Sequence, residues 1–309
     1  MRKVIGIGES VLDIVLKNNQ PKSANPGGSA FNAVISLGRC GLPSCFLTEM
    51  GDDYVADLTI GFMEQSGVAT HFVTQIPNSK SKVSLAFLND KNEASYQFYR
   101  DPEPENLVYS MPPINPDDLV LISSFYAVNP SIRYRVQPFL KKAHEAGAII
   151  YYDVNFRMNH ASSIPAVMAS VRENFSLASV VRGSVEDFKI LYGTTDAQEI
   201  YEKYVSPYCP ILILTNGANP VRIYTPTLHL QFDVEQMETV STIGAGDNYN
   251  AGVLYYLYKN KIGKADLQKL QSEQWHELQK EAESFATHVC QSIENYVSVE
   301  FGKKKAPTR

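Results

Sequence analysis

Short apolar runs recur along the chain, and between them lie longer stretches in which apolar residues return every three or four positions. The runs are typical of buried strands, and the longer stretches are typical of amphipathic helices. We predict strands over 3–8, 44–51, 118–124, 148–155 and 210–217, and helices over 29–40, 131–147, 163–175 and from near Gly246 to 260. This alternation predicts an α/β fold with a mainly parallel sheet sandwiched by helices on both faces, whose ligand sits at the carboxyl ends of the strands.

One stretch departs from this pattern. Residues 82–100 contain two segments of partial alternation around the polar turn NDKNE, which predicts a hairpin. A hairpin attached to an α/β body indicates a small lid or an oligomer contact. Because no repeat, low-complexity segment or Pro-rich linker interrupts the chain, we treat residues 1–309 as a single domain.

The composition of the chain limits the kinds of partner that we expect the protein to bind. The formal net charge of −5 and the lack of a basic stripe argue against a nucleic-acid partner. Four cysteines without metal-type spacing are typical of reduced thiols in a cytoplasmic protein. The first apolar run is interrupted by Glu9, Ser10 and Asp13, so we predict neither a signal peptide nor a membrane partner.

The stretch STIGAGDNYNAG, residues 241–252, places Gly244, Ala245 and Gly246 directly before Asp247 and a predicted helix. Glycines at a helix N-terminus let unpaired N–H groups approach an anion such as phosphate. A carboxylate at that point can accept a proton from an attacking hydroxyl. The alternative is an Asp that caps the helix by accepting its free N–H groups.

A second stretch, NPGGSAFNAVISLGRCG at 25–41, puts Gly27 and Gly28 before a helix that carries Asn32 near its start. It follows GESVLDIV, which contains Asp13. Acids and amides beside a glycine turn suit sugar hydroxyls, which both donate and accept hydrogen bonds. The alternative is that Ser29 caps the helix and Asn32 is satisfied locally.

Taken in order, these stretches resemble the ribokinase-like (PfkB-type) carbohydrate kinase family over nearly the full chain. The two glycine stretches resemble its N-terminal and C-terminal signatures. Between them QFYR at 97–100, DVNFR at 153–157, SVEDFKILYG at 184–193 and TNG at 215–217 match family landmarks in order.

The resemblance implies transfer of the γ-phosphoryl group of ATP to a sugar hydroxyl, with Mg²⁺. Asp247 would be the base, and its anion hole would be the turn of Gly244, Ala245 and Gly246. The residues implied at the sugar are Asp13, Gly27, Gly28 and Asn32. Those implied at the nucleotide are Ser184, Asp187, Thr215 and Gly217 with Gly244 and Gly246, and Asp187 would influence the metal indirectly. Segments 11–25 and 82–100 would form the family's β lid, which in many relatives also builds a homodimer contact.

The chain departs from the family pattern in three places. Ser241-Thr242 replaces the usual Asp-Thr, which puts a monovalent-cation site near that Asp in doubt. The family's Asn-x-x-Glu element reads Ser184 to Asp187, with a shorter carboxylate. FATHVCQS stands where relatives often carry an Asn-bearing, Ala-rich helix, so the adenine contacts are not predicted. None of these changes removes Asp247 or its glycines.

Two arginines bear on which substrate the sequence predicts. QFYR with the acidic DPEPENL after it, and DVNFR, resemble the fructokinase and 2-keto-3-deoxygluconate kinase branch. Arg100 and Arg157 could reach a sugar hydroxyl, a carboxylate or ATP phosphates. Alternatively, Arg157 could simply pair with Asp153 or with a carbonyl at a strand end. We predict a fructokinase, with a 2-keto-3-deoxygluconate kinase as the alternative. Because fold does not fix function, a non-catalytic sugar-binding protein is the third hypothesis.

Overall fold

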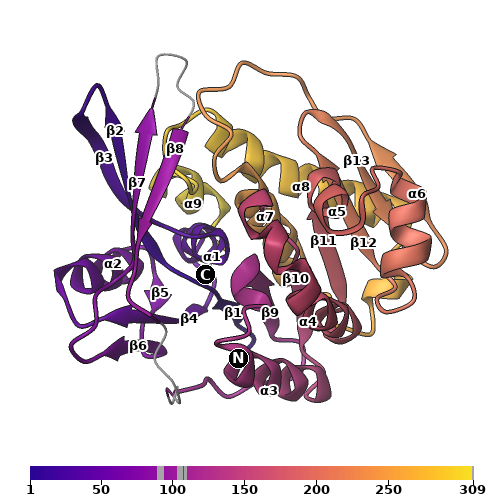
Figure 1. Ribbon diagram of the computed structural model, residues 1–309. Coiled ribbons are helices and arrows are strands. Elements are labelled where there is room, and N and C mark those ends of the chain that lie inside the picture. The colour runs from indigo at the N-terminus through magenta and orange to yellow at the C-terminus, as the bar shows by residue number, and fades with distance from the viewer. Residues whose placement is uncertain (89–93, 103–106, 108–109, 308–309) are drawn as a thin grey trace.

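The computed structural model describes residues 1–88, 94–102, 107 and 110–307 (Figure 1). Within them the chain forms a large sheet flanked by helices and a small separate sheet. The predicted turn at 89–93 lies outside the described residues. No helix in the described ranges combines the length and apolar character needed to cross a membrane.

The large sheet is mostly parallel, as predicted. Its strands from β5 across to β12 are parallel, and β13 and β14 add an antiparallel edge. A further strand, β6, pairs with β4. In order across the sheet the strands are β5 (Val68–Ala69), β4 (Ser44–Gly51), β1 (Val4–Ile7), β9 (Leu119–Ser123), β10 (Ile149–Asp153), β11 (Val180–Ser184), β12 (Leu212–Asn216), β13 (Asn219–Tyr224) and β14 (His229–Phe232), with β6 (Val73–Ile76) beside β4. All five predicted strands are present.

Helices cover both faces of this sheet because successive strand residues point to opposite sides. In β9, Leu119 and Leu121 join one apolar core, whereas Val120 and Ile122 join the other. The helices on the first face are α1 (Ser29–Arg39), α2 (Tyr54–Gln65), α7 (Ala245–Lys259), α8 (Ser272–Cys290) and α9 (Val299–Lys305). Those on the second are α3 (Arg133–Glu145), α4 (Ile164–Leu177), α5 (Val185–Tyr192) and α6 (Ala197–Glu199), which continues into a π-helical turn at Ile200–Val205. Short 3₁₀ helices lie at Phe125–Ala127, Met158–Ser163 and Leu267–Lys269.

The small sheet stands beside the large one, as Figure 1 shows at the upper left. Its order is β3 (Gln20–Gly27), β2 (Val11–Lys17), β7 (Val83–Leu88) and β8 (Ala94–Tyr99). The predicted hairpin is the antiparallel pair β7 and β8. The pairing of β7 with β2 is parallel and joins the two segments into one sheet.

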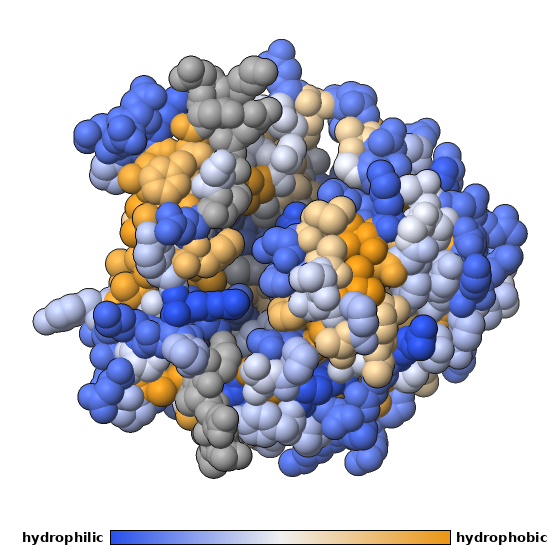
Figure 2. Space-filling view, in the orientation of Figure 1, coloured by the Kyte–Doolittle hydropathy of each residue, from blue (hydrophilic) through white to orange (hydrophobic). Residues whose placement is uncertain are grey.

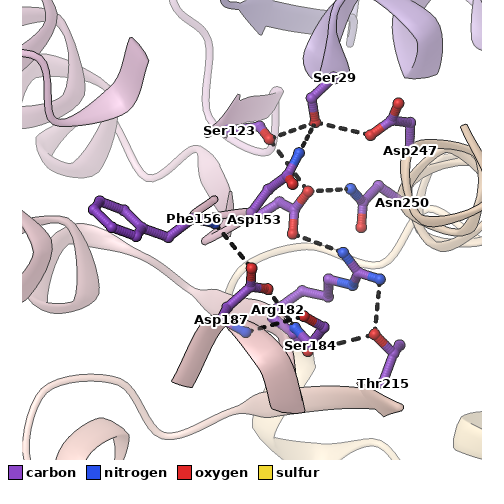
Figure 3. A network of polar contacts seen from close by, with 12 residues as sticks. Ser29, Ser123, Asp153, Phe156, Arg182, Ser184, Asp187, Thr215, Asp247 and Asn250 are labelled. Carbon is purple, nitrogen blue, oxygen red and sulfur yellow. Dashed lines mark hydrogen bonds and ion pairs between the residues drawn. The ribbon is translucent and has the colours of Figure 1, made fainter. Parts of the chain in front are cut away.

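The carboxyl ends of the parallel strands meet at one edge of the large sheet and place polar side chains side by side. Ser123, the last residue of β9, pairs in register with Asp153, the last residue of β10. Asp153 in turn pairs with Arg182 of β11. Helices α1 and α7 both begin at this edge, because Ser29 and Asp247 in their first turns contact each other there (Figure 3).

Candidate functional site

Asp247 lies in the first turn of α7, and its carboxylate contacts α1 rather than its own helix. Ser29 Oγ donates to its Oδ1 at 2.8 Å, and Asn32 Nδ2 donates to its Oδ2 at 2.8 Å. The N-cap residues of α7 and α1 are Gly244 and Gly28, so neither helix is capped by a side chain at that position. The alternatives of a capping Asp247, a capping Ser29 and a locally satisfied Asn32 are therefore wrong.

The turn before α7 is open to an anion. Gly244 has a φ of +79°, and a side chain there would come within 2.8 Å of the backbone oxygen of Asn295, so the position requires glycine. Among the described residues, no hydrogen bond engages the backbone N–H of Gly246 or Asp247. Unpaired N–H groups at the start of a 15-residue helix favour a negatively charged group.

Burial makes Asp247 a stronger base than an ordinary carboxylate. It raises the pKa of Asp247 to about 6, with a further contribution from the charge of Asp153, while the hydrogen bonds from Asn32 and Ser29 oppose the rise. A carboxylate with a pKa near neutrality is suited to accept a proton at physiological pH.

The predicted sugar residues lie together beside Asp247. Asp13, on β2, places Oδ2 only 2.6 Å from the position that a Cβ of Gly27 would occupy, and burial raises its pKa to about 6. Gly28 has a φ of +134°, and a Cβ there would meet the backbone oxygen of Glu9 at 2.2 Å. Asn32 is buried and connects this group to Asp247. The close approach of backbone and carboxylate explains why both glycines are needed.

A buried polar network lies beneath the site, and sequence reasoning missed most of it (Figure 3). Asp153 accepts from Arg182 Nη1 at 2.9 Å and from Asn250 Nδ2 at 2.8 Å. Arg182 Nη2 also donates to Thr215 Oγ1 at 2.8 Å. The available signal was an arginine inside the apolar run that became β11, since a buried charge needs a buried partner.

Ser123 and Asn155 complete this network. Ser123 Oγ lies 2.7 Å from Ser29 Oγ and 3.2 Å from Asp153 Oδ2. Asn155 has an unusual φ of +34°, and its Nδ2 donates to Ser29 Oγ at 2.9 Å. These contacts link Asp247 to Asp153 across the edge of the sheet.

Ser184 and Asp187, predicted at the nucleotide, form the capping box of α5. The carboxylate of Asp187 accepts from Phe156 N at 2.9 Å and from Ser184 N at 2.6 Å. Burial raises the pKa of Asp187, and the charge of Asp153 adds to this. Both oxygens accept from backbone donors, so this carboxylate fixes the backbone at Phe156 and at the start of α5.

Thr215 and Gly217 lie at the end of β12. The hydroxyl of Thr215 is buried against Arg182, whereas Gly217, with a φ of +56°, faces open space. Within the described residues, no three Asp, Glu, His or Cys side chains are arranged to hold a metal ion.

The two predicted arginines are both exposed. Arg100 Nη1 lies 4.0 Å from Glu9 Oε1. Arg157 follows β10, and its charge lowers the pKa of Asp247, the smallest of the influences on that carboxylate. The alternative that Arg157 pairs with Asp153 is wrong, because the charged partner of Asp153 is Arg182.

A helix start with unpaired N–H groups, a carboxylate of raised pKa in its first turn and polar groups at the carboxyl edge of a parallel sheet are the features expected of phosphoryl-transfer enzymes with a ribokinase-like fold. The chain belongs to the pfkB family of carbohydrate kinases, whose profile matches residues 1–271. The family resemblance seen in the sequence is thereby confirmed.

Relatives support the same class. The chain is 24% identical over 263 residues to a fructokinase of Vibrio alginolyticus, covering 84% of this chain and 85% of that protein. It is 25% identical over 271 residues to the probable fructokinase-4 of Arabidopsis thaliana, covering 81% of each. The fold is similar to that of a Xylella fastidiosa fructokinase with bound ATP, with a TM-score of 0.82 at 22% identity, covering 98% of this chain and 97% of that one. For a Vibrio cholerae fructokinase with fructose, ADP and calcium the TM-score is 0.83 at 20% identity, covering 97% and 96%.

The raised pKa of Asp247 predicts a stability effect. Because the folded protein holds the Asp247 proton more tightly than the unfolded chain does, ionisation of this carboxyl destabilises the fold as pH rises from about 4 to about 6. Asp247→Asn should therefore raise the free energy of unfolding by about 2 kcal/mol at pH 7.5 and by little near pH 4. Urea denaturation at the two pH values measures this. Asp57→Asn, at an exposed carboxylate on α2, should give no such gain, and an unchanged or lower stability of Asp247→Asn at pH 7.5 would contradict the prediction.

Proposed function

We propose that this carbohydrate kinase is a fructokinase, which transfers the γ-phosphoryl group of ATP to a hydroxyl of fructose. The single observation that carries the kinase chemistry is the placement of Asp247 beside the turn at Gly244, held by Ser29 and Asn32. The choice of fructose is supported by the relatives named fructokinase.

Asp247 acts as the general base. The attacking sugar hydroxyl becomes more acidic as its oxygen bonds to phosphorus, and the carboxylate accepts its proton. The N–H groups of Gly246 and Asp247, with Gly244 and Ala245 shaping the turn, stabilise the charge on the phosphoryl oxygens. Asp13 and Asn32 hold the sugar hydroxyls beside the glycine pair Gly27 and Gly28.

ATP approaches from the ends of β11 and β12, where Thr215 and Gly217 lie. Gly217 leaves open space for a bound group. When bound, Mg²⁺ would neutralise charge on the transferring phosphates. Asp187 would influence it indirectly, by fixing the segment at Phe156 and the end of β11 through its backbone contacts.

The small sheet is a lid over the sugar. Asp13 belongs to β2, so movement of this sheet would carry a sugar ligand with it. Figure 2 shows a hollow between the small-sheet side and the helical body, where a substrate would enter. Closure of such an element excludes water from the reacting phosphoryl group.

The second role of the small sheet is to form the contact between the two copies of a homodimer. The described part of β8 presents Phe98 at 57% exposure and Tyr99 at 50%, and Phe87 on β7 is 40% exposed. Exposed apolar side chains on an edge strand favour contact with another protein surface.

A 2-keto-3-deoxygluconate kinase is the second candidate. This function is favoured by Arg157, which is exposed and has no ion pair within the described residues. Its charge lowers the pKa of Asp247. A guanidinium free to form a fork is the preferred partner of a carboxylate, which a keto-deoxy acid carries and fructose does not.

A panel of acceptors decides between these functions. Purified protein with ATP and Mg²⁺ should release ADP fastest with fructose, compared at equal concentrations with ribose, glucose and 2-keto-3-deoxygluconate. Faster turnover of the keto-deoxy acid would replace the first choice by the second. Sugar binding by calorimetry with no ADP release from any acceptor would instead indicate a non-catalytic binding protein.

The role of Arg157 has its own prediction. Arg157→Met keeps the bulk of the side chain and removes the fork, so kcat/KM for fructose should fall about threefold to tenfold. A substrate carboxylate left without its partner would lose a hundredfold or more, on the order of 3 kcal/mol. Arg172→Met, at an exposed arginine on α4, is the matched control and should leave kcat/KM unchanged. A hundredfold loss with fructose itself would show that Arg157 contacts something other than a substrate carboxylate.

A further inference from the structure

Two carboxylates of this protein are joined through two serine hydroxyls. The contacts run from Asp247 Oδ1 to Ser29 Oγ at 2.8 Å, from Ser29 Oγ to Ser123 Oγ at 2.7 Å, and from Ser123 Oγ to Asp153 Oδ2 at 3.2 Å (Figure 3). Ser123 and Asp153 are almost completely buried, so water does not replace these partners. We refer to these four side chains as the serine bridge.

The serine bridge lacks one proton when both acids are ionised. Three contacts between oxygens need three protons, and an ionised carboxylate supplies none. Each serine supplies one, so two protons serve three contacts. The other donor to Ser29, Nδ2 of Asn155, fills a lone pair of Ser29 and adds no proton between the bridge oxygens.

The missing proton belongs at the Asp247 end. Asp153 is held as an anion by Arg182 Nη1 at 2.9 Å and by Asn250 Nδ2 at 2.8 Å. Asp247 has no cation among its hydrogen-bond partners, which are the neutral Ser29 and Asn32, and its charged neighbours are Asp153 and Arg157. The guanidinium of Arg182 lies beside Gly246, but it is paired with Asp153. One added proton on Asp247 lets the carboxyl donate to Ser29, Ser29 to Ser123, and Ser123 to Asp153.

We propose that Ser29, Ser123 and Asp153 are positioning residues that stabilise the protonated form of Asp247 by completing a chain of hydrogen bonds. This inference rests on the proposed function, in which Asp247 accepts the proton of the sugar hydroxyl. As the new bond from sugar oxygen to phosphorus forms and the bond from phosphorus to the ADP oxygen breaks, that proton moves to Asp247. The Ser29 proton then turns from Asp247 to Ser123, whose own proton already points to Asp153, and no further reactant is needed.

Ser123→Ala tests the bridge, because it removes the second acceptor of the Ser29 proton. Ser29 would then donate to Asp247 in all states, which favours the ionised carboxylate. The pKa of Asp247 should fall by about 0.5–1 unit, the size of one net hydrogen bond. The probe is ¹³C NMR titration of protein labelled at the aspartate carboxyl carbon, with the Asp247 signal identified by its loss in Asp247→Asn. In the kinase assay, the acid limb of the pH profile of kcat/KM should shift to lower pH by the same 0.5–1 unit. At pH 8, kcat should fall about threefold to tenfold.

Ser36→Ala is the matched control. Ser36 is buried on the same helix, α1, and its hydroxyl donates to Asn248 of α7 without touching Asp247. Its loss should lower the melting temperature and leave the pKa of Asp247 unchanged. If Ser123→Ala does not fold, Ser123→Cys keeps the bulk with a weaker hydrogen-bonding group and should give a smaller fall in the same direction.

The outcomes separate the two claims. An unchanged pKa of Asp247 in the Ser123 variants, or an equal shift in Ser36→Ala, would overturn the serine bridge while leaving the kinase activity intact. A protein that phosphorylates no sugar would remove the proposed function, and the NMR titration, which needs no substrate, would still decide whether the bridge governs the Asp247 proton.

Discussion

The contact of Asp247 with Ser29 and Asn32 is the interaction on which the rest of the site depends. It joins the first turn of α7 to the first turn of α1, helices that are more than 200 residues apart in the sequence. The same pair of helices is also joined by Ser36 and Asn248. Because both helices begin at the carboxyl edge of the sheet, fixing them against each other brings Gly28 and the turn at Gly244 close together, as the proposed reaction requires.

This arrangement is sustained by buried polar groups rather than by apolar packing alone. Asp153 and Arg182 form an ion pair that is almost completely buried, and Asn250 and Thr215 satisfy further atoms of it. Such a pair adds little net stability compared with apolar residues of similar size, because both charges are removed from water. Removing one partner alone is strongly destabilising. We infer that the pair fixes the geometry of the polar groups beneath Asp247, at the expense of stability that a purely apolar core would provide.

Much of the fold and the signature residues could be predicted from local sequence patterns. The contacts between those residues could not. The strand runs, the helix starting after Gly244 and the hairpin partners β7 and β8 follow from periodicity and glycine punctuation. The parallel pairing of β7 with β2 does not, because it joins segments about 70 residues apart. The partner of Asp153 likewise depends on the register of β10 against β11, which no local pattern fixes. For the same reason the sequence left open whether Ser29 caps its own helix, whereas its hydroxyl donates to Asp247.

The central claim is that Asp247 is the base of the phosphoryl transfer, and single-turnover kinetics of Asp247→Asn tests it most directly. With Mg²⁺ and saturating fructose and ATP, the rate of sugar phosphate formation should fall on the order of 100-fold or more, the scale of a positioned general base. The dissociation constants of both substrates should change little, since Asn keeps the shape of the side chain. A near-normal rate would contradict the account, because Asn cannot accept the proton.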